Sequence, residues 1–193
     1  MKKKRKAIFG FGGHAKEVAS FINEPLTFFV DDKYSNHETK PLSSFSIDEF
    51  QIMIAIGDSK VREKISKKLA KAQFFTFIHP TAIIGKNVQI GYGSYIGPFS
   101  VITCDVNLGN HSILNRFNAV GHDVICDDFL SMMPGAIIGG NCNLGKCVFL
   151  GSHSVVREKI NICNDVILGL NSGVVKNIQE SGVFVGTPAI KIK

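Results

Sequence analysis

Every sixth residue between positions 84 and 174 is apolar, without a break. Sixteen successive positions keep this spacing, and nine of them are followed directly by glycine. An α-helix repeats every 3.6 residues and a strand every two, so neither accounts for a repeat of six. The sixteen positions are Ile84, Ile90, Ile96, Ile102, Leu108, Leu114, Val120, Cys126, Met132, Ile138, Leu144, Leu150, Val156, Ile162, Leu168 and Val174. A fixed hexapeptide repeat predicts a parallel β-helix, and the unbroken register predicts no long loop leaving it.

The first 78 residues lack this repeat and alternate strand and helix patterns instead. We expect strands at Lys6–Gly10, Leu26–Val30, Gln51–Ile56 and Phe74–Ile78, and helices at Ala15–Ile22 and Ser59–Ala72. In the second helix, Val61, Ile65 and Leu69 form one apolar stripe. The alternation predicts a small Rossmann-like parallel α/β sheet. The sequence therefore predicts two domains, residues 1–78 and 79–193, with His79-Pro80 at the junction.

Composition excludes several classes of protein. The 193 residues carry a net charge of +6, but no nucleic-acid-binding module is recognisable. The five cysteines are odd in number and form no CxxC pair, which favours a reducing, cytoplasmic compartment. The apolar stretch behind the basic residues Met1–Lys6 is too short and too rich in glycine for a signal peptide, and no transmembrane segment is expected.

A glycine turn follows the first expected strand. Gly10, Gly12 and Gly13 precede a helix, and such a turn lets a phosphate approach the helix N-terminus. Asp31 lies about 20 residues further on, where dinucleotide-binding folds place a ribose-binding acid. The pattern is not a full GxGxxG, so a tight structural turn is an equally good reading. Because the domain is about half the size of a dinucleotide fold, we favour a nucleotide-sugar pocket over NAD.

His122 and Asp123 are the candidate catalytic pair. In a β-helix, residues 18 apart stack on neighbouring coils, which lie ~4.8 Å apart. His122 is then expected above Cys104 and below Gly140, where the missing side chain leaves room for a ligand. Asp123 can fix the imidazole tautomer, and the pair then forms a general base with an orienting partner. A surface pair at a loop corner is the alternative reading.

Other chemistries are less favoured. His111 and His153 are second choices for the base, and His14 and His79 serve the structure or the acceptor pocket. The spacing of His111, His122 and His153 does not suit a metal site, so we expect none. A covalent mechanism through Cys104 needs an activated thiolate and is a minor possibility.

The chain resembles a known family along nearly its full length. The shared motifs are FGFGGHAKEV (9–18), FVDDK (29–33), IAIGDSKVREKI (54–65), IHPTA (78–82), MPGAIIGGN (133–141) and GVFVGTPA (182–189), together with Asn115 and Gly121-His122-Asp123. They are similar to those of hexapeptide-repeat bacterial sugar acetyltransferases, the group of bacillosamine-type N-acetyltransferases and sialic acid O-acetyltransferases. The closest similarity is to enzymes that acetylate the 4-amino group of a UDP-linked amino sugar for a surface glycan or glycoprotein.

This resemblance implies a left-handed β-helix and a homotrimer without membrane insertion. Acetyl-CoA would lie between adjacent prisms, and the N-terminal domain would hold a nucleotide-linked amino sugar. His122 would be the base and Asp123 its partner. The residues implied for the CoA groove are Asn115, Ser131, Gly140, Gly151, Gly169 and Lys176. Those implied for the nucleotide sugar are Gly12, Gly13, His14, Asp31, Asp32, Lys33, Ile56 and Gly57.

One position departs from the family pattern. Several relatives carry a second histidine nine residues after the base, near the thioester carbonyl, and this chain has Ser131 there. A hydroxyl can donate a hydrogen bond but carries no positive charge, so it polarises the carbonyl less. Two alternatives to N-acetyl transfer therefore stay open. They are O-acetylation of sialic acid or another sugar, and a non-catalytic trimer that binds nucleotide sugars.

Overall fold

The computed structural model describes residues 4–193 and divides into two compact units, one ending at Thr76 and one spanning Phe77–Lys193. This boundary lies two residues before the expected one. The stretch expected as one strand, Phe74–Ile78, forms two strands, β5 (Gln73–Phe74) and β6 (Phe77–Ile78). Because β6 pairs with β9 (Tyr95–Ile96), it belongs to the second unit.

The first unit is built on a five-stranded parallel sheet with the order β3-β2-β1-β4-β5. Its remaining strands are β1 (Arg5–Phe9), β2 (Leu26–Val30), β3 (Lys40–Pro41) and β4 (Phe50–Ile54). Its helices are α1 (Gly13–Ser20) and α2 (Ser59–Lys68), with short 3-10 turns η1 (Asp32–Tyr34) and η2 (Leu42–Ser44). The predicted parallel α/β sheet is present, and β3 is a strand that the sequence did not indicate. No helix within residues 4–193 is long and apolar enough to cross a membrane.

The core of this unit is rich in aromatic side chains. Phe29 packs edge-on against Phe45 and Phe50, with ring centroids 5.3 Å away in both cases. Ile65 of α2 and Leu69, the residue that follows this helix, complete this core. The prediction that Val61 belongs to the buried stripe of α2 is wrong, because Val61 is 43% exposed. Arg62 occupies the buried face in its place, and α2 ends at Lys68 rather than at Ala72.

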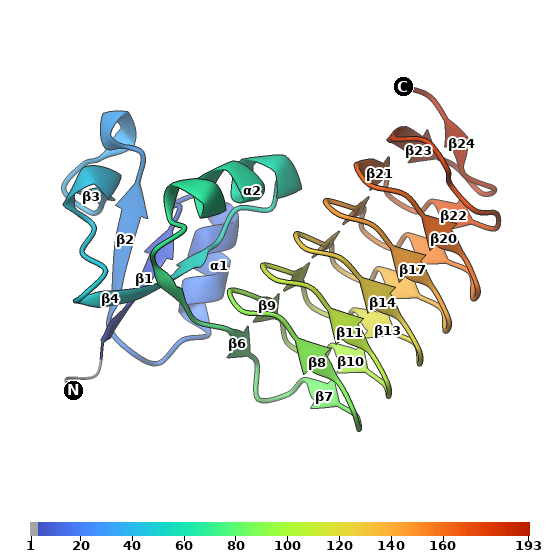
Figure 1. Ribbon diagram of the computed structural model, residues 1–193, viewed down its shortest axis with the longest axis horizontal. Helices are drawn as coiled ribbons and strands as arrows, with labels where there is room; N and C mark the ends of the chain where they lie inside the picture. Colours follow the sequence, from blue (N-terminus) through green and yellow to red (C-terminus); the bar gives the residue numbers. More distant parts are fainter. Residues whose placement is uncertain (1–3) are drawn as a thin grey trace. The chain divides into compact units, whose positions relative to one another are not determined.

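The second unit is a parallel β-helix with three faces (Figure 1). Face I contains β6, β9, β12 (Ile113–Leu114), β15 (Ser131–Met132), β18 (Phe149–Leu150), β21 (Val166–Leu168), β23 (Gly182–Val185) and β24 (Ile190–Lys191). Face II contains β7 (Ile83–Ile84), β10 (Val101–Ile102), β13 (Ala119–Val120), β16 (Ile137–Ile138), β19 (Val155–Val156) and β22 (Gly173–Val174). Face III contains β8 (Gln89–Ile90), β11 (Asn107–Leu108), β14 (Ile125–Cys126), β17 (Asn143–Leu144) and β20 (Asn161–Ile162).

The apolar ladder fills the interior of this prism. From Ile96 to Val174 its members are buried together in one core, and Ile84 and Ile90 pack against them. Strand partners differ by 18 residues, as between Val101 and Ala119. Cys126, a member of the ladder, and Cys142 are both buried in this core, and burial raises the pKa of both thiols. The C-terminal hairpin of β23 and β24 lies beyond the ladder and was not expected.

The three edges of the prism share one backbone conformation. Every sixth residue from 87 to 171 has a positive φ, and thirteen of these residues are not glycine. This left-handed region is costly for most side chains and is tolerated best by Asn and Asp. We name the edges by the faces they join. The I–II edge contains residues 115–118, the II–III edge residues 121–124, and the III–I edge residues 109–112, each with its counterparts 18 residues away.

Candidate active site

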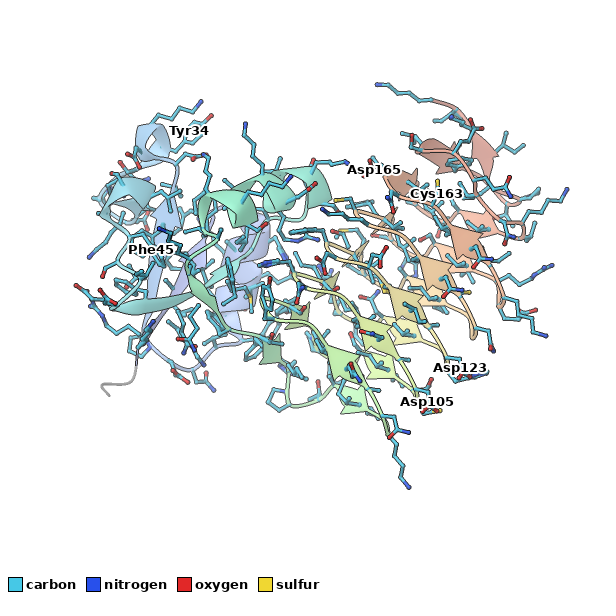
Figure 2. The ribbon with its side chains drawn as sticks, in the orientation of Figure 1. Tyr34, Phe45, Asp105, Asp123, Cys163 and Asp165 are labelled. Atoms are coloured by element: carbon cyan, nitrogen blue, oxygen red, sulfur yellow. The ribbon has the colours of Figure 1, made fainter. Side chains whose placement is uncertain are left out.

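His122 and Asp123 form a hydrogen-bonded pair at the II–III edge. The Nδ1 atom of His122 lies 2.7 Å from Oδ2 of Asp123. Neighbouring side chains of a strand point to opposite sides, but Asp123 has a φ of 57°, and this corner conformation lets the two side chains meet. The bond to Nδ1 leaves Nε2 as the nitrogen available to a substrate. Figure 2 shows Asp123 at the edge of the prism, one coil above Asp105.

The coil above His122 has a glycine at the stacked position. A Cβ added to Gly140 would lie 2.7 Å from Nε2 of His122, so a side chain at this position would force the imidazole to shift. Backbone hydrogen bonds fix the stack, because Asn141 N donates to His122 O (2.8 Å) and Asp123 N donates to Cys104 O (3.1 Å). The predicted order Cys104, His122, Gly140 is therefore the order in the structure. Its consequence is that Nε2 faces a bare backbone segment.

The alternatives to His122 lie elsewhere. His111 sits on the III–I edge, is 2% exposed and stacks on Phe129 with centroids 5.2 Å apart. His153 lies on the I–II edge, so three different edges hold the three histidines. Within residues 4–193, no cluster of three metal-ligating side chains is present. For Cys104, burial raises the thiol pKa and the nearby Asp105 raises it further, which disfavours the thiolate that a covalent mechanism needs.

The residues implied for the CoA groove fall into two columns. Gly140 and Lys176 stack with His122 on the II–III edge, because their numbers differ by multiples of 18. Asn115, Gly151 and Gly169 form a second column on the I–II edge for the same reason. Face II lies between the two columns, so the structure of one chain does not bring Asn115 to His122. Each column is straight, and each could line one wall of a groove.

A hollow of about 370 Å³ lies on the outer surface of face II. Its lining is mainly apolar and includes Ile137, Val155 and Gly173, with Arg157 and Glu158 at the II–III edge. Glu158 stacks one coil above Gly140, so this hollow begins next to the bare backbone that faces His122. An apolar hollow running from a base toward the later coils suits a long, flexible acyl donor.

Ser131, at the position of the family's second histidine, lies in β15 on face I. Its neighbour Met132 points into the prism, so Ser131 points outward, and it is fully buried. Its strand partners are Ile113 and Phe149. Within one chain, Ser131 and His122 are therefore on different parts of the prism, and Ser131 does not join the His122 pair.

The residues implied for the nucleotide sugar gather at one edge of the parallel sheet in the first unit. Gly12, Gly13 and His14 follow β1, Asp31 to Lys33 follow β2, and Ile56 and Gly57 follow β4. The carboxyl ends of parallel strands share an edge, and ligands bind there where the strand order reverses. In this sheet the reversal lies at β1, since β2 and β4 flank it. All eight predicted residues therefore lie at the edge where open α/β sheets hold a ligand crevice.

The glycine turn after β1 has two distinct roles. Gly10 has a φ of 115°, and a Cβ there would lie 3.1 Å from Ala55 O, so the turn passes close to the end of β4. In contrast, no described atom lies within 4 Å of a Cβ added to Gly12 or Gly13. These two glycines are therefore not required for packing. They leave the N-terminus of α1 accessible to an anion.

The two acidic residues after β2, Asp31 and Asp32, have different hydrogen-bond partners. Asp32 Oδ1 accepts a hydrogen bond from Ser43 N (2.9 Å), and this bond lowers the pKa of the Asp32 carboxyl. Asp31 Oδ1 accepts from Lys68 Nζ at 2.7 Å. Both carboxylates, with Lys33 and Lys64, border a hollow of about 640 Å³. Asp32 thus holds its own loop, and Asp31 is the better placed of the two for a ribose.

Arg62 is a residue that sequence reasoning missed. Its side chain is fully buried, and Nη1 donates to the carbonyl oxygens of Ile56 (2.6 Å) and Gly57 (3.2 Å). The sequence signal that could have identified Arg62 as buried is its spacing, three residues before Ile65 and seven before Leu69. That spacing places Arg62 on the buried face, where a charged residue requires partners.

Comparisons with known proteins agree with this architecture. Residues 6–69 match the family model of the PglD N-terminal domain. UDP-N-acetylbacillosamine N-acetyltransferase of Bacillus subtilis is 33% identical over 108 residues, which are 47% of this chain and 50% of that protein. The chain thus spans about half the length of this curated relative.

Two solved structures match over both units. The acetyltransferase domain of PglB from Neisseria gonorrhoeae, in complex with acetyl coenzyme A, is 26% identical with a TM-score of 0.87, covering 98% of this chain and 100% of that one. A perosamine N-acetyltransferase variant from Caulobacter crescentus, in complex with CoA and GDP-perosamine, is 24% identical with a TM-score of 0.86, covering 98% and 97%. These matches confirm the expected left-handed sense of the β-helix. They also confirm the resemblance to the bacillosamine-type hexapeptide-repeat sugar acetyltransferases, whose two-part fold this chain has.

Proposed function

We propose that this protein transfers an acetyl group from acetyl-CoA to the amino group, at C4, of a nucleotide-linked amino sugar. The observation that carries the proposal is the His122–Asp123 pair, with its 2.7 Å hydrogen bond and its place beside the bare backbone of Gly140. The likeness to the Bacillus and Neisseria proteins supports the reaction class. The crevice at the carboxyl ends of β1, β2 and β4 supports a nucleotide-linked acceptor.

The reaction proceeds by direct transfer. The sugar amine attacks the thioester carbonyl, and Nε2 of His122 takes the proton that the amine loses as the new C–N bond forms. Asp123 accepts from Nδ1 and stabilises the imidazolium. Backbone amides near Gly140 stabilise the oxyanion of the tetrahedral intermediate. The C–S bond then breaks, and the proton on His122 passes to the leaving thiolate, so that the products are the amide and free CoA.

A homotrimer explains why the groove residues lie in two columns. In one chain the two columns lie at opposite edges of face II, with His122 in one and Asn115 in the other. A second copy placed beside the first would bring its I–II edge toward the II–III edge of its neighbour. Acetyl-CoA would then bind between Gly140 and Lys176 of one chain and Asn115, Gly151 and Gly169 of the next. The apolar hollow on face II fits the pantetheine arm.

The nucleotide sugar is assigned to the first unit. Gly12 and Gly13 offer the N-terminus of α1 to the pyrophosphate, and Asp31 accepts from a ribose hydroxyl. His14 donates to the ligand from the first turn of α1. The remaining contacts come from Asp32, Lys33, Ile56 and Gly57.

The test is acetyl transfer by the His122→Ala variant. Loss of a general base lowers kcat by about 10²–10⁴-fold. The assay follows CoA thiol release with UDP-, dTDP- and GDP-linked amino sugars and with free sialic acid. His37→Ala is the matched control, because His37 is an exposed histidine in the first unit with no assigned role in the reaction. Turnover of His122→Ala within a few-fold of wild type would contradict the assignment. Thiol release with sialic acid alone would show O-acetylation instead, and no release with any sugar would favour a binding protein.

A further inference from the structure

Arg62 ties the loop after β4 to helix α2. A buried guanidinium is stable only when its donors are satisfied, and Nη1 donates to Ile56 O at 2.6 Å and Gly57 O at 3.2 Å. Both carbonyls belong to residues just past the carboxyl end of β4. Asp58, the next residue, caps α2 by accepting from Val61 N at 2.9 Å. The loop is therefore held from the helix side by one charged side chain and one cap.

The positive charge of Arg62 also acts on His14, which follows the glycine turn after β1. His14, in the first turn of α1, is largely buried, and burial lowers its pKa. Glu17, 3.6 Å from Nδ1, raises that pKa, whereas the positive charge of Arg62 lowers it. Arg62 is thus within electrostatic range of the β1 loop and bonded to the β4 loop. These two loops form the walls of the crevice at the reversal of strand order.

The walls themselves are nearly bare backbone. Among the described residues, no atom lies within 4 Å of a Cβ added to Gly12, Gly13 or Gly57. Glycines let a ligand approach closely but provide no side-chain packing of their own. The Ile56–Gly57 wall is therefore held by the Ile56 side chain, which packs against the core, and by Arg62 from behind the loop.

We propose that Arg62 is a positioning residue for the nucleotide part of the acceptor. It fixes the Ile56–Gly57 wall against α2 through its two hydrogen bonds. The inference rests on the proposed nucleotide-sugar site and adds the residue that gives this site its shape. Arg62 itself need not touch the ligand, because its donors are directed at the backbone carbonyls of the loop.

Two variants test the role. Arg62→Met removes the hydrogen bonds to Ile56 and Gly57 and should raise KM for the nucleotide amino sugar by about 10- to 100-fold, the scale of hydrogen bonds made by a charged group. The values of kcat and of KM for acetyl-CoA should stay within about twofold, since only acceptor binding is affected. Arg62→Lys keeps the charge and one donor group and should recover most of the loss. Lys71→Met, an exposed residue just beyond α2, is the charge-matched control.

A second readout does not depend on turnover. The His14 titration, followed by NMR, should move to higher pH in Arg62→Met and remain in place in Arg62→Lys and Lys71→Met, because only the first variant removes the charge near the imidazole. Calorimetry with UDP, dTDP and GDP gives the affinity of the crevice directly. If Arg62→Met binds the nucleotide more weakly but wild type transfers no acetyl group, the positioning role of Arg62 is supported and the proposed reaction is refuted.

Three results would overturn the role of Arg62. They are an unchanged nucleotide-sugar KM and nucleotide affinity in a folded Arg62→Met, an unmoved His14 titration, or no binding of any of the three nucleotides by wild type. If Arg62→Met does not fold, the Arg62→Lys variant is the test. The proposal expects Arg62→Lys to raise the nucleotide dissociation constant by a few-fold while the His14 titration stays in place. If Arg62→Lys binds the nucleotide as tightly as wild type, the proposal is refuted.

Discussion

His122 is oriented by its own neighbour rather than by burial. Its side chain is 58% exposed, and Asp123, at 55%, is equally open to solvent. An exposed ion pair contributes little to stability, so the pair has little structural purpose at this corner. Its 2.7 Å hydrogen bond serves to select one tautomer and one ring orientation. This geometry is what a base needs, and it fits the position beside Gly140.

His14 predicts a pH dependence of stability. Burial keeps its pKa in the folded state below that of the unfolded chain, which is about 6.5. The unfolded state therefore binds more protons below that pH, and the folded state loses stability as the pH falls from about 6.5 toward the lowered pKa. Urea unfolding of the wild type between these pH values should show this decline.

In His14→Gln the decline should be smaller, because glutamine does not titrate. His37→Gln, which changes an exposed histidine, should retain the wild-type slope. An unaltered slope in His14→Gln would assign the pH dependence to other groups.

At the scale of elements, the β-helix could be predicted from the hexapeptide ladder because a period of six fits only this backbone geometry. Each ladder residue fills the same interior position, and the strands fall where the repeat places them, from β7 to β22. The strands β3, β23 and β24 were not readable, since they lie outside the repeat and form through their pairing with β2, β21 and each other. The buried face of α2 was misread at Val61, because apolar residues alone were used to find it. Arg62 is buried through hydrogen bonds that only the folded loop provides.

The ladder also predicts how stability is distributed along the prism. Leu150, in β18, is fully buried between coils. Leu150→Ala should lower the free energy of unfolding by about 2–5 kcal/mol, the usual loss for a large-to-small change in a packed core. Ile190→Ala, at a position 66% exposed in β24 outside the ladder, should change it by less than about 0.5 kcal/mol. Equal losses in denaturant titrations of the two variants would contradict the assigned interior.

At the scale of the whole molecule, the proposed site is incomplete in one chain, because its two columns lie on two edges of the prism. The sequence predicted the partners of His122 along its own column, since stacking follows from counting by 18. Counting by 18 also separates Asn115 and Ser131 from that column, but it does not give their distance from His122. Their distance from His122 depends on the triangular section of the coil, and the proposed trimer would restore the proximity.

Two exposed aromatic rings mark the edge expected to meet a second copy. Phe99 and Phe117 stack on the I–II edge with centroids 5.3 Å apart and are 55% and 58% exposed. If this edge packs against a neighbouring prism, Phe117→Asp should shift the protein from trimer toward monomer and lower acetyl transfer with it, because a buried unpaired carboxylate is costly. Sedimentation velocity measures the assembly, and circular dichroism checks the fold.

Tyr34→Asp is the control for the assembly measurement, since Tyr34 is an exposed ring (64%) in the first unit. An unchanged trimer in Phe117→Asp would place the contact on another edge. A wild-type monomer that transfers acetyl groups would refute the shared site altogether.

The 18-residue pairing has a further consequence for motion. Each coil of the prism is bonded only to the coil before it and the coil after it, as Val101 is to residues 83 and 119. Such an array can open from its ends one coil at a time, while the middle stays closed. The turn that bears His122 follows β13, the third of six strands on face II. Fraying at either end therefore leaves the base in place, and amide hydrogens in its coil should be among the last of the prism to exchange.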